Sequence, residues 1–149
     1  MRGLIKRHIE IYTDGSCDPN PGPGGWAAVI LEGGQKKILK GYSEFSTNNR
    51  MELTAALNAL KNVDSGEPLK IYTDSQYLKK GVEEWLEHWK ANNWKRKGGV
   101  LANIDLWKDI SLEIAGRKIT WCWVRGHAGN PYNELVDKLA QQARTSKGK

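Results

Sequence analysis

The tetrapeptide Ile-Tyr-Thr-Asp occurs twice in this chain, at residues 11–14 and 71–74. Each copy closes a run in which apolar and polar residues alternate, which is the pattern of a β-strand with one buried face. Each copy is followed by a small residue, Gly15 or Ser75. One carboxylate at a strand end is common, but two strands that end alike suggest that the fold brings both ends together.

Three strands are predicted before the first helix. They lie at residues 8–13, 26–31 and 36–45. A turn rich in Gly and Pro, residues 15–25, separates the first two, and a Gly-Gly turn at 33–34 separates the second from the third. Because short turns join antiparallel neighbours, we expect these strands to form a meander.

A helix follows at residues 46–62, with Thr47, Asn48 or Asn49 as its N-cap. Its buried stripe, at helical spacing, is Leu53, Ala56, Leu57 and Leu60. The later elements are a strand at 68–74, a long helix at 75–93, a helix at 103–116, a strand at 117–126 and a helix at 132–144. We expect Gly81 to interrupt the long helix and Pro131 to occupy the first turn of the last one.

The order of these elements is β-β-β-α-β-α-α-β-α. The fourth strand is reached through a helix, so it pairs in parallel with an earlier strand by a right-handed crossover. If it lies beside the first strand, the result is an α/β fold with a five-stranded mixed sheet of order 3-2-1-4-5, strand 2 antiparallel, and helices on both faces. We expect one domain over residues 1–149, with flexible ends at about 1–7 and 144–149.

Composition limits the class of protein. Hydrophobic residues make up 39% and charged residues 27%, as in globular proteins, and the longest apolar run is only the six residues 26–31. We therefore expect no membrane segment, and we expect a cytoplasmic monomer. Cys17 and Cys122 lack metal-ligand spacing, so free buried thiols are expected. The net charge of +6 favours a polyanionic partner, nucleic acid first.

The two Thr-Asp endings predict a metal site. Asp14 and Asp74 would lie about 5 Å apart on neighbouring strands, where two carboxylates repel unless a cation lies between them. Oxygen ligands of this kind suit Mg²⁺ or Mn²⁺. Either residue alone has a simpler interpretation, because Asp74 or Ser75 can cap a helix and Asp14 can open a turn. For the pair we favour the site.

Two further acids stay ambiguous from the pattern. Glu52 lies early in the first helix, beside a sector of small residues that can approach the sheet. It can also form a capping box with Asn49, and the pattern favours that slightly. Asp137 lies between the apolar residues Val136 and Leu139 of the last helix, where both a rim salt bridge and a metal ligand remain open.

Residues 85–97 combine aromatic and basic side chains. Trp85 and Trp89 are one helical turn apart, so they can form a core stripe covered by lysine stems. They can also form a nucleic-acid surface, where rings stack on sugars or bases and cations meet phosphates. We expect a mixture, with partly packed indoles and exposed cations. The remaining members of this group are Trp94, Lys90, Lys95, Arg96 and Lys97.

Taken together, these stretches resemble the type 1 ribonuclease H family (bacterial RNase HI). The matching segments are YTDGSC, NPGPGGW, TNNRMEL, YTDSQY, the Trp-Lys pairs at Trp89 and Trp94, NIDLW and VRGHAGNPYNELVDKLA. They occur in the family's order and cover nearly the whole chain. The resemblance implies the same 3-2-1-4-5 sheet. It also implies an endonuclease that hydrolyses the RNA strand of RNA/DNA hybrids with two Mg²⁺ ions, which Mn²⁺ can replace, leaving 3′-hydroxyl and 5′-phosphate ends.

The resemblance also implies roles for individual residues. The catalytic and metal-binding carboxylates fall on Asp14, Glu52, Asp74 and Asp137, and the loop histidine that shuttles protons or helps product release falls on His127. Residues that line the minor groove of the hybrid fall on Cys17, Asn20, Asn48, Asn49 and Gln76. A phosphate pocket for the DNA strand falls on Thr47 and Trp85, and the substrate-binding protrusion on Trp89, Lys90, Trp94 and Lys95.

The protrusion departs from the family pattern. Residues 91–93 are Ala-Asn-Asn, where relatives often carry lysine or arginine, and residues 96–102 replace a stretch that commonly holds more lysine and a proline. We therefore expect weaker substrate binding there. Two other functions stay open: a nucleic-acid-binding module without turnover, and a DNA strand-transferase on the same fold. The four acids argue against the first, because unneeded anions weaken binding to a phosphate backbone. The fourth acid and the lack of further DNA-binding domains argue against the second.

Overall fold

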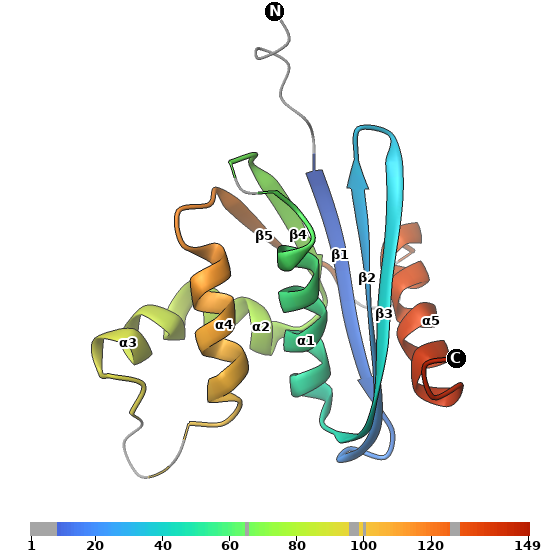
Figure 1. Ribbon diagram of the computed structural model, residues 1–149, viewed down its shortest axis with the longest axis horizontal. Coiled ribbons are helices and arrows are strands. Elements are labelled where there is room, and N and C mark those ends of the chain that lie inside the picture. The colour runs from blue at the N-terminus through green and yellow to red at the C-terminus, as the bar shows by residue number, and fades with distance from the viewer. Residues whose placement is uncertain (1–8, 65, 96–98, 100, 126–128) are drawn as a thin grey trace, which may run out of the picture.

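A computed structural model describes residues 9–64, 66–95, 99, 101–125 and 129–149. It has a central sheet with helices on both faces (Figure 1). The strands are β1 (Ile9–Cys17), β2 (Gly22–Glu32), β3 (Gln35–Ser46), β4 (Leu69–Thr73) and β5 (Ile119–Trp123). The helices are α1 (Asn48–Lys61), α2 (Gln76–Lys80), α3 (Leu86–Ala91), α4 (Ile104–Ile114) and α5 (Pro131–Thr145), with a π-helical segment, Gly81–Trp85, between α2 and α3.

The sheet confirms the predicted topology. Its order is β3-β2-β1-β4-β5, with β2 antiparallel to both of its neighbours and β4 parallel to β1 and β5. The two copies of the repeated tetrapeptide are paired in register, with Ile11 opposite Ile71 and Tyr12 opposite Tyr72. The repeat therefore marks equivalent positions on two adjacent parallel strands.

The predicted turn at residues 15–25 is wrong in extent. β1 continues to Cys17 and β2 begins at Gly22, so only residues 18–21 turn. The glycines serve close packing instead. A Cβ on Gly15 would lie 2.4 Å from the backbone nitrogen of Glu52, and one on Gly25 would lie 2.4 Å from the carbonyl oxygen of Ala140. These glycines thus let α1 and α5 approach opposite faces of the same hairpin.

Helix α1 begins as predicted, with Thr47 as its N-cap. The Thr47 hydroxyl accepts a hydrogen bond from the backbone N–H of Arg50 at 3.1 Å. Glu52 is therefore the fifth helical residue rather than the third, which rules out the capping box with Asn49. The predicted stripe of Leu53, Ala56, Leu57 and Leu60 is buried.

The predicted helix at 75–93 is interrupted near Gly81, as expected, but by a π-helical segment rather than a clean break. A Cβ on Gly81 would lie 2.0 Å from the ring of Trp107, so the small residue lets α4 pack against this turn. The hydroxyl of Tyr77 accepts hydrogen bonds from Asn103 Nδ2 at 3.2 Å and Trp107 Nε1 at 3.1 Å, which fixes α2 to α4. β5 spans five residues, fewer than the ten predicted.

The core lies on both faces of the sheet. On one face α1, α4 and the α2–α3 region enclose Leu53, Leu78, Leu86, Trp107 and Ile110. On the other, α5 covers the sheet through Val136 and Ala140 (Figure 1). Cys17 is buried as expected, whereas Cys122 is only half-buried, and both are free thiols. Within the described ranges, every helix is too short or too polar to cross a bilayer.

Candidate active site

Three acids from three elements converge at one edge of the sheet. Asp14 lies on β1, Asp74 directly follows β4, and Glu52 is on α1. One carboxylate oxygen from each lies within 4.8 Å of the others. The parallel pairing of β1 with β4 places the two aspartates side by side, and the missing side chain of Gly15 lets α1 bring Glu52 against them. We call Asp14, Glu52 and Asp74 the carboxylate cluster.

The cluster is largely shielded from water. Asp14 is 4% exposed and Glu52 is 7% exposed, while Asp74 is half-buried. The backbone N–H of Gly15 donates to Asp14 Oδ1 at 2.9 Å. Glu52 Oε1 is buried and has no hydrogen-bond partner among the residues that the structure describes. A buried carboxylate oxygen without a donor is costly unless a cation or a proton compensates it.

Crowding and burial make ionisation of these acids unfavourable. Burial, together with the negative charges of Asp74 and Asp137, raises the pKa of Asp14 to about 8. Burial and the charges of Asp14 and Asp74 raise the pKa of Glu52 well above its ordinary value. Burial and the charge of Asp137 also raise the pKa of Asp74. The raised pKa of Asp14 therefore favours its protonated form at neutral pH when no cation is bound.

A divalent cation fits this donor set. All of the donors are carboxylate oxygens, which is the ligand type of Mg²⁺ and Mn²⁺. A bound cation would favour the ionised forms of Asp14 and Glu52, whose pKa values are raised in the protein alone, and would give Oε1 of Glu52 a partner.

Asp137 adjoins the cluster from the opposite face of the sheet. It is half-buried on α5, outside the three acids whose oxygens lie within 4.8 Å, but near enough for its charge to raise the pKa of Asp14 and Asp74. Its Oδ2 accepts a hydrogen bond from Gln141 Nε2 at 3.1 Å. No ion pair with Asp137 occurs among the described residues, so the rim salt bridge that the pattern left open is not seen there. His127 lies outside the described residues.

The residues predicted to line a minor groove lie at the end of β1 and the start of α1. The side chain of Asn48 accepts from the backbone N–H of Cys17 at 2.7 Å, and its backbone N–H donates to Asn20 Oδ1 at 3.1 Å. Asn20, Asn48 and Asn49 are exposed. Cys17 is 6% exposed, and its Sγ is turned toward the carbonyl oxygens of Gly22 and Ser46, so its side chain braces the turn.

The remaining predicted substrate residues extend from α2 past α3. Gln76 is exposed at the start of α2, next to the capping residue Ser75. Trp85 and Trp89 are partly packed, with ring centroids 5.8 Å apart, and they border an open pocket of about 340 Å³ with Tyr77. Trp94 is also partly buried, and Lys108 lies over its ring at 5.8 Å. Lys90 and Lys95 are exposed, which matches the predicted mixture, while Arg96 and Lys97 lie outside the described residues.

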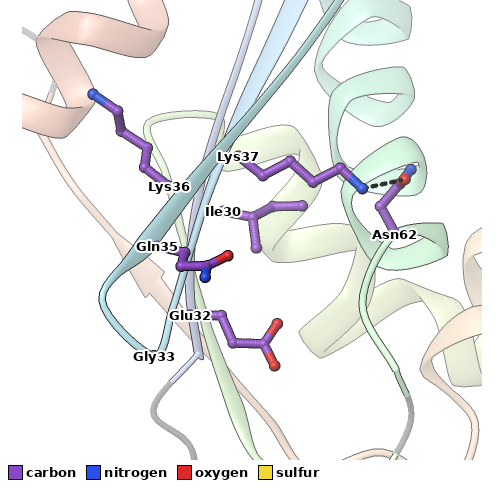
Figure 2. A pocket seen from close by; sticks show the side chains of 7 residues that line it. All are labelled: Ile30, Glu32, Gly33, Gln35, Lys36, Lys37 and Asn62. Atoms are coloured by element: carbon purple, nitrogen blue, oxygen red, sulfur yellow. Dashed lines mark hydrogen bonds between the residues drawn. The ribbon is translucent and has the colours of Figure 1, made fainter.

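A second hollow lies at the opposite end of the sheet and contains no predicted site residue. It is formed around the β2–β3 hairpin and the end of α1 (Figure 2). In Figure 2, Lys37 extends to Asn62, and its Nζ donates to Asn62 Oδ1 at 3.2 Å. Lys36 is directed away from it, across the strand. Lysines on an edge strand discourage pairing with other chains. This structural role explains Lys36 and Lys37, so no ligand needs to be invoked for this hollow.

Comparison with known proteins decides the family. The sequence model of the RNase H family matches residues 6–145. The chain belongs to the RNase H family. It is therefore a nuclease and a hydrolase. The chain is 47% identical to ribonuclease H from Hahella chejuensis, over 89% of this chain and 90% of that protein. It is 49% identical to ribonuclease H from Granulibacter bethesdensis, over 91% of each.

Solved structures agree with the RNase H fold. LC9-RNase H1, a type 1 RNase H with the type 2 active-site motif, is 28% identical with a TM-score of 0.84, over 96% of this chain and 74% of that one. LC11-RNase H1, solved in complex with an RNA/DNA hybrid, is 22% identical with a TM-score of 0.71, over 93% of this chain and 98% of that one. The second likeness supports the fold alone.

Sequence reasoning missed two features that build the site of this RNase H. The sequence pattern assigns Gly15 to a turn, whereas in the structure it is the contact point for the backbone of α1. Arg50 pairs with Asp105 through two hydrogen bonds and ties the first turn of α1, near Glu52, to α4. The sequence patterns of TNNRMEL and NIDLW give no sign of that pair, because it joins residues 55 positions apart.

Proposed function

We propose that this RNase H is an endonuclease that hydrolyses the RNA strand of RNA/DNA hybrids and leaves 3′-hydroxyl and 5′-phosphate ends. Membership of the family supports RNA cleavage, and a protein of the same fold was solved with an RNA/DNA hybrid. The observation that carries the proposal is the carboxylate cluster: its oxygens lie within 4.8 Å of one another, and the buried Oε1 of Glu52 has no hydrogen-bond partner among the described residues.

Two Mg²⁺ ions, which Mn²⁺ can replace, would be held by Asp14, Glu52, Asp74 and Asp137. When bound, such a pair lowers the pKa of attacking water and stabilises the charge on the leaving 3′-oxygen. Asp14 would contact both ions, a role supported by its nearness to the other three acids. Asp137, on the other face of the sheet, would hold the nucleophile-side ion.

The other predicted residues would bind and orient the hybrid. Asn20, Asn48, Asn49 and Gln76 offer polar groups for the minor groove, where the ribose 2′-hydroxyl distinguishes RNA from DNA. Glu52 would also meet a 2′-hydroxyl. The buried Cys17 would act through its backbone and its brace on the turn. Thr47 and Trp85 would receive a DNA phosphate, with Trp89, Lys90, Trp94 and Lys95 extending the contact.

His127 would move protons near the attacking water or the departing product. Its position lies outside the described residues, so this role rests on the resemblance of the loop sequence. The single domain over residues 1–149, the monomeric state and the cytoplasmic location also stay predictions from sequence.

The test uses one RNA/DNA hybrid labelled separately on each strand, with the wild type and Asp14→Asn, with and without Mg²⁺. We expect cleavage of the RNA strand only, and only when both Mg²⁺ and Asp14 are present. End analysis should find 3′-hydroxyl and 5′-phosphate groups. Intact RNA with every divalent ion, or equal cleavage by Asp14→Asn, would overturn the proposal. Cleavage of an all-DNA duplex would favour the strand-transferase alternative.

A further inference from the structure

Arg144 forms a contact that none of the functional assignments above uses. It lies near the end of α5, and its side chain is only 18% exposed. Its Nε donates to Ser16 Oγ on β1 at 3.1 Å, and its Nη1 lies 3.7 Å from Asp18 Oδ2 in the turn that follows β1. One arginine on the last helix therefore reaches the first strand, 128 positions earlier, and the turn that carries Asn20.

The backbone of Arg144 is fixed at the same place. A Cβ on Gly25 of β2 would lie 2.5 Å from the backbone nitrogen of Arg144, so helix and strand are in direct contact there. Gly25 is the register partner of Ser16. The backbone of Arg144 thus rests on one member of this pair while its side chain bonds to the other. This double attachment leaves little freedom for the end of α5 to slide over the hairpin.

Ser16 and Asp14 face α5 together. Tyr12 packs with Val136 and Ala140 of α5, and residues two apart on a strand point to the same face. Asp14 and Ser16 continue that series along β1. On α5, Asp137 and Arg144 are seven residues apart, which is close to two helical turns and hence the same side. The pair Asp137 and Asp14 therefore lies next to the pair Arg144 and Ser16.

We propose that Arg144 is a positioning residue, which holds α5 against β1 so that Asp137 completes the metal site beside Asp14. This inference rests on the proposed function. Asp137 needs such support because it reaches the site from a separate helix on the opposite face, and it lies outside the tight cluster of three. Removing the arginine should let Asp137 retreat and leave the cluster itself in place.

Asp18 has a smaller part in this attachment. The Arg144–Asp18 separation is long and the Asp18 side chain is 76% exposed, so the ion pair is weak in water. The hydrogen bond to Ser16 is shorter and better shielded, and we assign the positioning effect to it. Asp18→Asn should therefore change the Mg²⁺ requirement much less than Arg144→Met does.

The test measures Mg²⁺ binding in two ways. Arg144→Met keeps the aliphatic stem and removes both polar contacts. We expect the Mg²⁺ concentration for half-maximal cleavage to rise about tenfold, as for other residues that orient a metal ligand. Without substrate, the rise in thermal midpoint caused by Mg²⁺ should shrink. In Arg144→Lys, the Mg²⁺ requirement and the Mg²⁺-induced rise in thermal midpoint should both lie between those of the wild type and those of Arg144→Met, because one donor group remains.

Two comparisons separate positioning from general stability. Arg117 is a similarly buried arginine that binds the carbonyl oxygens of Leu60 and Val63 at the end of α1. Arg117→Met should lower the thermal midpoint and leave the Mg²⁺ requirement unchanged. In an Asp137→Asn background, Arg144→Met should add no further change in the Mg²⁺ requirement, because the ligand it positions is already gone.

An unchanged Mg²⁺ requirement in Arg144→Met, or a full effect that persists in the Asp137→Asn background, would overturn the inference. Failure of the proposed function looks different. In that case the wild type itself would not cut hybrids, whereas the Mg²⁺-induced change in thermal midpoint would still report on Arg144.

Discussion

The carboxylate cluster and the aromatic segment, residues 85–95, are both expected to meet the substrate, yet they are built in opposite ways. The cluster gathers three carboxyl groups in a shielded place, and a buried oxygen of Glu52 has no hydrogen-bond partner among the residues that the structure describes. In the aromatic segment, Trp89 packs with its ring centroid 5.3 Å from that of Trp107, and the lysines remain in water. The first region is incomplete without a ligand, whereas the second is satisfied by the protein.

This difference teaches where function conflicts with stability. In the metal-free protein, burying these carboxyl groups beside one another lowers the free energy of unfolding, because burial and mutual repulsion disfavour the ionised form of each acid. Packed indoles add to stability whether or not substrate is present. Substitutions in the two regions should therefore have opposite effects on stability, and very different effects on catalysis.

The largest effect should be on turnover. Asp74→Asn and Glu52→Gln keep size and remove a metal-binding charge, so we expect the rate of hybrid cleavage at saturating substrate to fall about a thousandfold or more. Trp85→Leu should instead raise the substrate concentration for half-maximal rate and change the maximal rate little. The measurement is steady-state cleavage of a labelled hybrid. If Trp85→Leu lowered the maximal rate of cleavage as much as Glu52→Gln does, the proposed difference between the two regions would be wrong.

The next effect should be on stability. Trp89→Ala removes ring contacts with Trp85 and Trp107, and we expect it to lower the free energy of unfolding by about 2–3 kcal/mol, less than for a fully buried ring. Glu52→Gln in metal-free buffer should raise that free energy, because a neutral amide replaces an acid whose charge is disfavoured. Urea unfolding followed by circular dichroism measures both. Changes of the same sign in the two variants would contradict the comparison.

How far the sequence predicts each region depends on which contacts are local. The sheet order followed from the sequence because the repeated tetrapeptide and the helical crossover are visible along the chain. The placement of Glu52 did not follow from the pattern alone. It depends on the missing side chain of Gly15, 37 positions earlier, and on α1 beginning at Asn48. Asp137 likewise depends on how α5 lies across the hairpin, which Gly25 and Arg144 decide through contacts between distant residues.

The pH dependence of stability should sharpen the account of the cluster. Asp14 has an ordinary pKa of 3.8 when unfolded and a pKa of about 8 when folded, so the folded state binds more protons between these values. The free energy of unfolding in metal-free buffer should therefore fall as the pH rises from 4 to 8. Asp14→Asn should flatten part of this slope. Parallel curves for the two proteins would show that Asp14 does not titrate in this window.

The smallest effect should come from the exposed lysines. Lys95→Gln should change the free energy of unfolding by no more than about 0.5 kcal/mol. If Lys95 meets a phosphate, the logarithmic salt slope of hybrid binding should become about one unit shallower. Lys36→Gln, on the β3 edge at the other end of the sheet (Figure 2), is the matched control and should leave that slope unchanged. Equal slopes for the wild type, Lys95→Gln and Lys36→Gln would show that Lys95 does not contact a phosphate of the substrate.

The most direct measurement is the thermal midpoint of the wild type and of Asp14→Asn, each in EDTA and in Mg²⁺. If the cluster is crowded in order to bind cations, Asp14→Asn should unfold at a higher temperature than the wild type in EDTA. Mg²⁺ should then raise the midpoint of the wild type and raise that of Asp14→Asn much less. A lower midpoint for Asp14→Asn in EDTA, together with no response of the wild type to Mg²⁺, would show that these carboxylates stabilise the fold and are not held for a metal.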